Sequence, residues 1–249
     1  MKLHLALGIS SGDVAAFVGA GGKSSAILAI ADELSEAGMT VVAVPTTKLL
    51  VSEAERIGPL VTSEDADELR AKAEEALSGG ASGVVVGSGL LSKNRIGGVD
   101  PGAVSSLTSL ADVVLVEADG SRRRPIKGTA DHEPALPNAA TLVVAVGNIS
   151  AFGAPVAEEI VHRPELFSNL TGIGAGQSIT ARAFARALVE GSLASIPDGA
   201  RSAALITGVR PGKTMADASV VTRDLWRFGV EKVVLSSLPD ESPSRIWLP

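Results

Sequence analysis

The sequence predicts an α/β fold: a three-layer domain built on a mainly parallel sheet of about seven strands. Two observations predict it. Short apolar runs recur along the chain, and most are continuously apolar, which is typical of strands buried on both faces of a parallel sheet. Segments with the apolar spacing of helices fall between several of these runs, and such alternation specifies right-handed βαβ units.

Seven apolar runs are the predicted strands, at residues 14–18, 41–44, 83–86, 112–116, 141–146, 203–207 and 232–235. Four helices are predicted between them. The first follows Lys23 and ends at Gly38, and the second has Ser63 as its N-cap. Residues 179–190 and 214–228 repeat the helical spacing.

Residues 87–102 and 118–139 lack clear periodicity, and long irregular stretches in a compact domain are usually functional or mobile. The sequence contains no internal repeat, low-complexity tract or convincing linker. We therefore expect residues 1–249 to form a single domain.

Composition excludes several classes of function. The chain has no Cys, which removes disulfides, thiolate metal sites and cysteine nucleophiles. A net charge of −6, with five Phe, two Trp and no Tyr, predicts no nucleic-acid binding. No apolar run approaches the ~18 residues of a membrane helix, and the N-terminus does not resemble a signal peptide. We expect a cytoplasmic protein that binds no membrane.

The sharpest motif lies between the first strand and the first helix. Glycines there let successive N–H groups point at an anion, and the helix N-terminus adds its dipole. In a phosphate-binding loop, Lys23 would reach the β- and γ-phosphates and the Ser24 hydroxyl would ligate Mg²⁺. This predicts a P-loop NTPase-like domain that binds ATP or GTP with Mg²⁺, although Phe17 stands where the pattern has its first glycine. The loop residues are Gly19, Ala20, Gly21, Gly22, Lys23, Ser24 and Ser25.

Two other interpretations of this loop stay open. Gly19-x-Gly21 resembles half of a dinucleotide loop, but the third glycine of that pattern falls on Ser24 and no acidic residue ends the second strand. Lys48 would then favour an NADP-binding reductase over one that uses NAD. The remaining interpretation is a tight glycine turn that binds nothing.

Polar residues follow two of the predicted strands, where ligands bind in such sheets. Thr46 and Thr47 could contact Mg²⁺ or the γ-phosphate, with Lys48 as an added charge for the phosphates, or the two hydroxyls could simply cap the strand's exit. After the fourth strand, Asp119 is expected to hold the metal with Ser24. Glu117 is expected to do the proton work, alone or through a water. The alternative is a pair of exposed acids at a strand tip.

A basic run follows these acids. Arg122 could act as an arginine finger, and the run as a whole could bind a small anionic substrate. The predicted substrate-binding residues are Arg122, Arg124, Lys127, His132 and Glu133. The alternatives are a solvated basic surface and a loop histidine with local hydrogen bonds.

An ordered set of motifs resembles the YqeC family, over roughly residues 14–235. It comprises Val-Gly-Ala-Gly-Gly-Lys-Ser (18–24), Pro-Thr-Thr-Lys (45–48), Glu-Ala-Asp-Gly-Ser-Arg (117–122), Arg-Pro-Ile-Lys (124–127), His-Glu-Pro-Ala-Leu-Pro (132–137), Val-Gly-Asn (146–148) and Val-His-Arg-Pro-Glu (161–165). Two departures stand out. Pro45 replaces a usual Thr, and Ile-Thr-Gly-Val-Arg (206–210) stands where relatives tend to have Asn-x-x-Asp, which leaves the base undecided.

The resemblance implies an accessory role in maturing selenium-dependent molybdenum hydroxylases. The expected partners are a molybdopterin-type cofactor or another small anion, and a molybdenum hydroxylase. Since the chain lacks Cys, any part in selenium insertion would be noncovalent or driven by nucleotide chemistry. The expected activity is that of an NTPase or phosphotransferase, and the alternative is a non-hydrolysing chaperone whose loops are ordered by the nucleotide.

Overall fold

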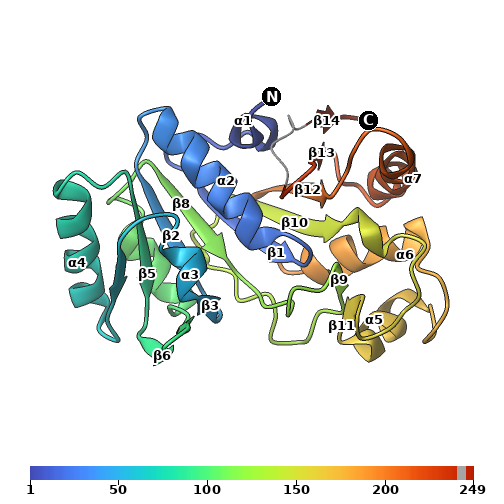
Figure 1. The fold of residues 1–249 in the computed structure, drawn as a ribbon, viewed down its shortest axis with the longest axis horizontal. Coiled ribbons are helices and arrows are strands. Elements are labelled where there is room, and N and C mark those ends of the chain that lie inside the picture. The colour runs from blue at the N-terminus through green and yellow to red at the C-terminus, as the bar shows by residue number, and fades with distance from the viewer. Residues whose placement is uncertain (240–244) are drawn as a thin grey trace.

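The computed structural model describes residues 1–239 and 245–249. In this part of the chain, the main sheet has nine strands in the order β14-β13-β12-β10-β1-β8-β2-β5-β4 (Figure 1). All neighbours are parallel except β13 and β14. The strands are β1 Val14–Gly19, β2 Val41–Pro45, β4 Leu60–Thr62, β5 Gly83–Gly87, β8 Val113–Glu117, β10 Leu142–Asn148, β12 Arg201–Thr207, β13 Val233–Leu235 and β14 Arg245–Trp247.

The predicted α/β class is confirmed, and all seven predicted strands are present. The structure adds two strands at the edges of the sheet, β4 and β14. Strand β1 is buried along its whole length, because it lies between β8 and β10 with both faces covered. Its side chains alternate: Val14, Ala16 and Val18 join one core cluster, whereas Ala15 and Phe17 join another.

Helices cover both faces of the sheet. Helices α1 (Leu3–Leu7) and α2 (Lys23–Glu36) pack on one face (Figure 1). The other face is covered by α4 (Ala66–Ser78), η1 (Pro101–Leu107), α5 (Pro164–Thr171), α6 (Ala181–Arg186) and α7 (Lys213–Arg227). The three predicted layers are therefore present. The short helix α3 (Val51–Ala54) lies beside β2 and β5 in a small cluster of its own.

Two helical predictions need correction. Asp65, not Ser63, caps α4, because its carboxylate accepts the N–H of Glu68 at 2.8 Å. Ser63 instead stabilises the turn before the helix, accepting the Asp65 N–H at 3.1 Å. The predicted helix over 179–190 is divided into α6 and a π-helical turn, η3 (Ala187–Ser192).

The two aperiodic stretches carry short strands. Strands β3 (Leu49–Leu50), β6 (Leu90–Ser92) and β7 (Arg95–Ile96) form a small antiparallel sheet. Strand β9 (Ile126–Lys127) pairs in parallel with β11 (Val161–His162). The short 3₁₀ turn η2 (Ile149–Ala151) follows β10. Two-residue strands carry too little periodicity to be recognised in sequence.

The order of the strands fixes where a ligand could bind. From β1 the chain crosses to β2 and β5, returns to β8 beside β1, and then continues on the opposite side with β10 and β12. Open α/β sheets bind ligands outside the carboxyl ends of their strands at such a switch point. The turn from β1 into α2 lies there (Figure 1). Among the described residues, no helix is long and apolar enough to cross a membrane.

Candidate functional site

The turn between β1 and α2 needs its glycines. The φ angles of Gly19, Gly21 and Gly22 are 86°, 75° and 126°, a region that residues with a Cβ rarely adopt. A Cβ on Gly21 would lie 2.5 Å from the carbonyl oxygen of Pro125 and 2.7 Å from the amide nitrogen of Asn148. The loop is therefore pressed against the end of β10 and the segment before β9.

Several backbone N–H groups of this loop are left without an acceptor. The Gly19 and Ala20 amides donate to Asp119 and to the Val146 carbonyl, both at 2.9 Å. No described residue accepts from the N–H of Gly21 or Gly22, and Gly22 gives α2 an N-cap with no side chain. Because the first amides of a helix also lack partners, this end of α2 is suited to an anion.

A cleft of about 380 Å³ opens in front of these amides. Its walls come from the β1–α2 loop, from α3, and from the segments that follow β8, β10 and β13. The lining residues are Gly21, Gly22, Lys23, Ser24, Ser25, Glu53, Glu117, Arg123, Pro125, Asn148, Ser150, Leu238 and Pro239. The cleft has the size of a small-ligand site, and its inner wall is the glycine-rich loop.

Lys23 lies at the base of the cleft and is almost fully buried, with 3% of its side chain exposed. Its ammonium donates to the Gly19 carbonyl at 2.8 Å and lies 3.2 Å from Oδ1 of Asp119, which is fully buried. Oδ1 accepts no hydrogen bond from the described residues, so its contact with Lys23 is an ion pair only. Lys23 therefore joins the end of the loop to its beginning at Gly19, and its positive charge neutralises the buried Asp119 carboxylate.

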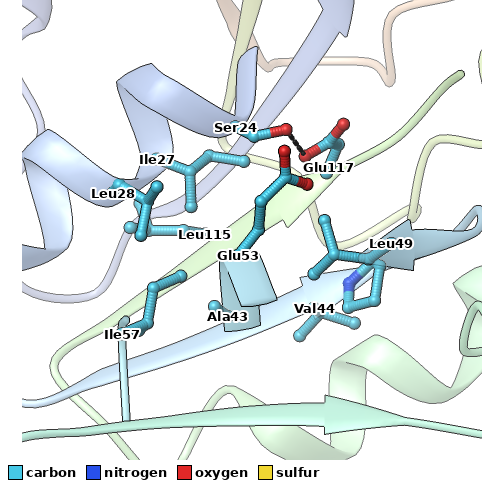
Figure 2. A pocket seen from close by; sticks show the side chains of 11 residues that line it. Ser24, Ile27, Leu28, Ala43, Val44, Leu49, Glu53, Ile57, Leu115 and Glu117 are labelled. Carbon is cyan, nitrogen blue, oxygen red and sulfur yellow. Dashed lines mark hydrogen bonds between the residues drawn. The ribbon is translucent and has the colours of Figure 1, made fainter. Parts of the chain in front are cut away.

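The carboxylate that contacts the Ser24 hydroxyl is that of Glu117, not of Asp119. Ser24 donates to Oε2 of Glu117 at 2.9 Å, and the Glu53 carboxylate of α3 points toward the same pair (Figure 2). Below them is a small apolar hollow of about 20 Å³, which the three polar side chains cover (Figure 2). Burial raises the pKa of Glu117 above its usual value, against the opposing effects of Lys23 and of the Ser24 hydrogen bond.

Lys127 and Glu133 are buried behind the loop. The Lys127 ammonium, 1% exposed, lies 3.1 Å from Oδ2 of Asp119 and 2.5 Å from Glu133. Arg163 donates to both oxygens of Glu133, at 3.1 Å through Nη2. Burial alone would raise the pKa of Glu133, but the hydrogen bonds from Arg163 and Lys127 outweigh it and lower this pKa to about 2. Neither side chain lines the cleft in this arrangement.

The other predicted residues are dispersed around the cleft. Thr46 has a structural partner, since its hydroxyl donates to the Ala135 carbonyl at 2.8 Å. Thr47 is partly buried and Lys48 is exposed, and neither lines the cleft. In the basic run, the residue that lines the cleft is Arg123, which lies 3.6 Å from Glu53. Arg122 and His132 are exposed and Arg124 is partly buried, all outside the lining.

Glu53 and Arg163 were missed by sequence reasoning. Glu53 belongs to a helix of only four residues, so its position beside Ser24 has no periodic signal. The hint in the sequence is that Glu53 follows the carboxyl end of the second strand by eight residues. Arg163 has a left-handed backbone (φ 59°) directly before Pro164. An unusual conformation of this kind marks a constrained residue, but it becomes visible only in the structure.

Fold and site together define a class: an α/β protein whose glycine-rich loop, buried lysine and acidic strand end meet at the switch point of a parallel sheet. The YqeC protein family matches residues 15–165. The chain belongs to this family.

Two comparisons accompany the family match. The chain is 28% identical over 233 residues to "Uncharacterized protein YqeC" of Escherichia coli (strain K12), covering 91% of this chain and 88% of that protein. Among solved structures, chloroplast FtsY from Physcomitrella patens aligns with 94% of this chain at 14% identity and a TM-score of 0.35. The present chain spans 61% of the length of that structure.

Proposed function

We propose that this protein binds a nucleoside triphosphate, ATP or GTP, with its phosphates on residues 19–25. The single observation that supports this most is the combination of free loop amides with a buried lysine at the base of one cleft. Amides and a lysine so placed recognise phosphate oxygens through both dipole and charge. On phosphate binding, the Lys23 ammonium exchanges Asp119 for the β- and γ-phosphate oxygens.

The donor atoms near Ser24 fit a hard cation such as Mg²⁺. The Ser24 hydroxyl and the Glu117 and Glu53 carboxylates are oxygen donors on one wall of the cleft. Among the described residues, no three His, Asp or Glu converge on a metal site. This also fits Mg²⁺, which usually takes one or two carboxylates and completes its shell with water and phosphate. The ion would supply charge neutralisation at the phosphates, and Ser24 with Glu53 would hold it, which leaves Glu117 free to take up a proton.

We further propose an accessory role in the maturation of selenium-dependent molybdenum hydroxylases. Family membership supports this role, and the position of Arg123 beside the cleft is compatible with a small anion or a molybdopterin-type cofactor. In this proposal, Glu117 or a water that it orients accepts the proton of the attacking group, and hydrolysis or phosphoryl transfer follows. A non-hydrolysing protein would use the same contacts only to order the loop.

Calorimetric titration of ATP, GTP and NADPH, each with and without Mg²⁺, tests the binding proposal on the wild type and on Lys23→Ala. We expect Mg²⁺-dependent triphosphate binding that weakens about 100-fold in Lys23→Ala, because a buried charge partner of the phosphates is lost. Lys213→Ala is the matched control. Lys213 also follows a glycine at the start of a helix, but it is 85% exposed and pairs with Asp217.

Three results would contradict the proposal. No triphosphate binding would indicate a glycine turn without a ligand, and equal losses in the two variants would show that Lys23 has no special part. Binding of NADPH alone, independent of Mg²⁺, would favour the dinucleotide interpretation of the loop. Turnover then separates an enzyme from a chaperone: robust turnover with a small acceptor favours the former, and slow turnover stimulated by a molybdenum hydroxylase favours the latter.

A further inference from the structure

Five charged side chains form one buried chain behind the loop, which we call the ion chain: Lys23, Asp119, Lys127, Glu133 and Arg163. Successive members lie within 3.2 Å of one another. The side chains are 3%, 0%, 1%, 8% and 28% exposed in this order. The ion chain therefore runs from the base of the cleft toward the surface at α5. Positive and negative charges alternate along it.

The ion chain holds three cations and two carboxylates, and therefore carries one surplus positive charge. Each carboxylate has two cationic neighbours. If Lys23 leaves, Asp119 keeps Lys127 and Glu133 keeps Arg163, so both buried carboxylates remain paired. If Lys127 is removed instead, Lys23 is the one cation left in contact with Asp119 among the described residues. Leaving the buried Asp119 carboxylate unpaired would cost free energy, so Lys23 is then held beside Asp119 and is less able to move to a phosphate.

We infer that Lys127 is a positioning residue for triphosphate binding: it takes over the charge of Asp119 and so frees Lys23 for the phosphates. This inference rests on the proposed function. Lys127 is too deeply buried to touch a ligand in the cleft, and its ammonium is fixed by three acceptors: Asp119, Glu133 and the Gly120 carbonyl. Asp119 also accepts the Gly19 N–H, so it must stay in place when Lys23 moves.

Lys127→Gln and Glu133→Gln form an informative pair, since each neutralises one partner of the same buried ion pair. In Lys127→Gln, Lys23 alone balances Asp119, and we expect MgATP or MgGTP to bind about tenfold more weakly. In Glu133→Gln, Lys127 has one carboxylate left and pairs with it more closely. Lys23 is then released more easily, and we expect the same nucleotide to bind more tightly than to the wild type.

A double variant keeps the inference testable if Lys127→Gln folds poorly. In Asp119→Asn/Lys127→Gln both partners of the buried pair are neutral, a change that such sites tolerate better than removal of one. The Asn side-chain oxygen can still accept the Gly19 N–H, and Lys23 keeps no ion-pair partner among the described residues. We expect triphosphate affinity to recover by about tenfold relative to Lys127→Gln. Thermal unfolding of each variant verifies that the titrated protein is folded.

The outcomes separate this inference from the proposed function. If the wild type binds no triphosphate, the proposed function fails and the inference with it. If the wild type binds triphosphate and Lys23→Ala does not, the proposed function is supported. The Lys127→Gln, Glu133→Gln and double variants then test the role of Lys127. Three results would each overturn the role of Lys127. Triphosphate affinity could fall equally in Lys127→Gln and Glu133→Gln, it could stay at the wild-type value in Lys127→Gln, or it could fail to recover in the double variant.

Discussion

At the scale of single residues, the site depends on contacts that leave no space for a side chain. Gly21 combines a φ of 75° with the backbone of Pro125 and Asn148 on the side where a Cβ would lie. The neighbouring Gly22 lies against the Thr207 side chain, whose Cγ2 would be 3.1 Å from an added Cβ. The loop's shape is therefore imposed by three other segments of the chain, and not by the glycines alone.

Gly21→Ala separates these effects. We expect it to destabilise the protein by more than the ~1–2 kcal/mol of a left-handed alanine, because the Cβ would also meet backbone at 2.5 Å. Gly38→Ala is the control, since Gly38 has a similar φ of 78° but no atom within 4 Å of the Cβ position. Urea unfolding measures both. An equal loss of unfolding free energy in the two variants would show that the loop can relax around the added methyl group.

At the scale of elements, the paired strands β9 and β11 connect the ion chain to the surface. His162 of β11 lies there, next to Arg163. Burial, with the positive charges of Arg163, Lys127 and Arg122, lowers the pKa of His162 to about 4, and the Glu133 carboxylate opposes this only in part. The folded protein thus holds this histidine neutral.

This histidine predicts a dependence of stability on pH. Between about pH 6.5 and 4 the unfolded chain binds a proton at His162 that the folded chain does not, so this contribution is complete above pH 6.5 and is lost as the pH falls toward 4. We expect His162→Gln to flatten the slope in this window, measured by urea unfolding at several pH values. The exposed His132→Gln is the control, and an unchanged slope in His162→Gln would contradict the assignment.

The elements also show how far sequence reasoning extends. Strands such as β1 and β10 were predictable because a run of buried apolar residues has no other common explanation in an α/β chain. The loop was predictable because Gly, Lys and Ser stand between a strand and a helix. The pairing of Ser24 with Glu117, and not with Asp119, was not, because β8 ends at Glu117 and strand geometry no longer places Asp119. The ion chain joins residues up to 140 positions apart in sequence, between Lys23 and Arg163, which no local pattern encodes.

At the scale of the whole molecule, one sheet runs from β4 to β14 without a break in strand pairing among the described residues. Such a sheet predicts a single cooperative unit. The two Trp residues of the chain, Trp226 and Trp247, lie together at the end of the sheet that carries β14, with ring centroids 6.5 Å apart. Their fluorescence therefore reports one end of the molecule, whereas far-UV circular dichroism reports all of it.

We expect urea unfolding curves followed by these two signals to coincide, with one midpoint and one slope. Separate transitions would divide the chain into two domains. Repeating the experiment with saturating nucleotide provides a second criterion, because a ligand that binds the folded state raises the midpoints of both signals together. A shift in only one signal would place the ligand in a separately unfolding part.

The strand that leads into the loop, β1, precedes its sheet neighbours β8 and β10 by about a hundred residues or more in the sequence. The Gly19 N–H donates to the Asp119 carboxylate, which is 100 residues further along the sequence. The Gly21 carbonyl accepts from the Thr207 hydroxyl, which is 186 residues further along. On the ribosome, β1 remains an uncovered apolar segment until β8 and β10 have emerged, a state in which nascent chains aggregate or recruit chaperones. The glycine-rich loop therefore reaches its final surroundings only after residues as far along as Thr207 have been translated.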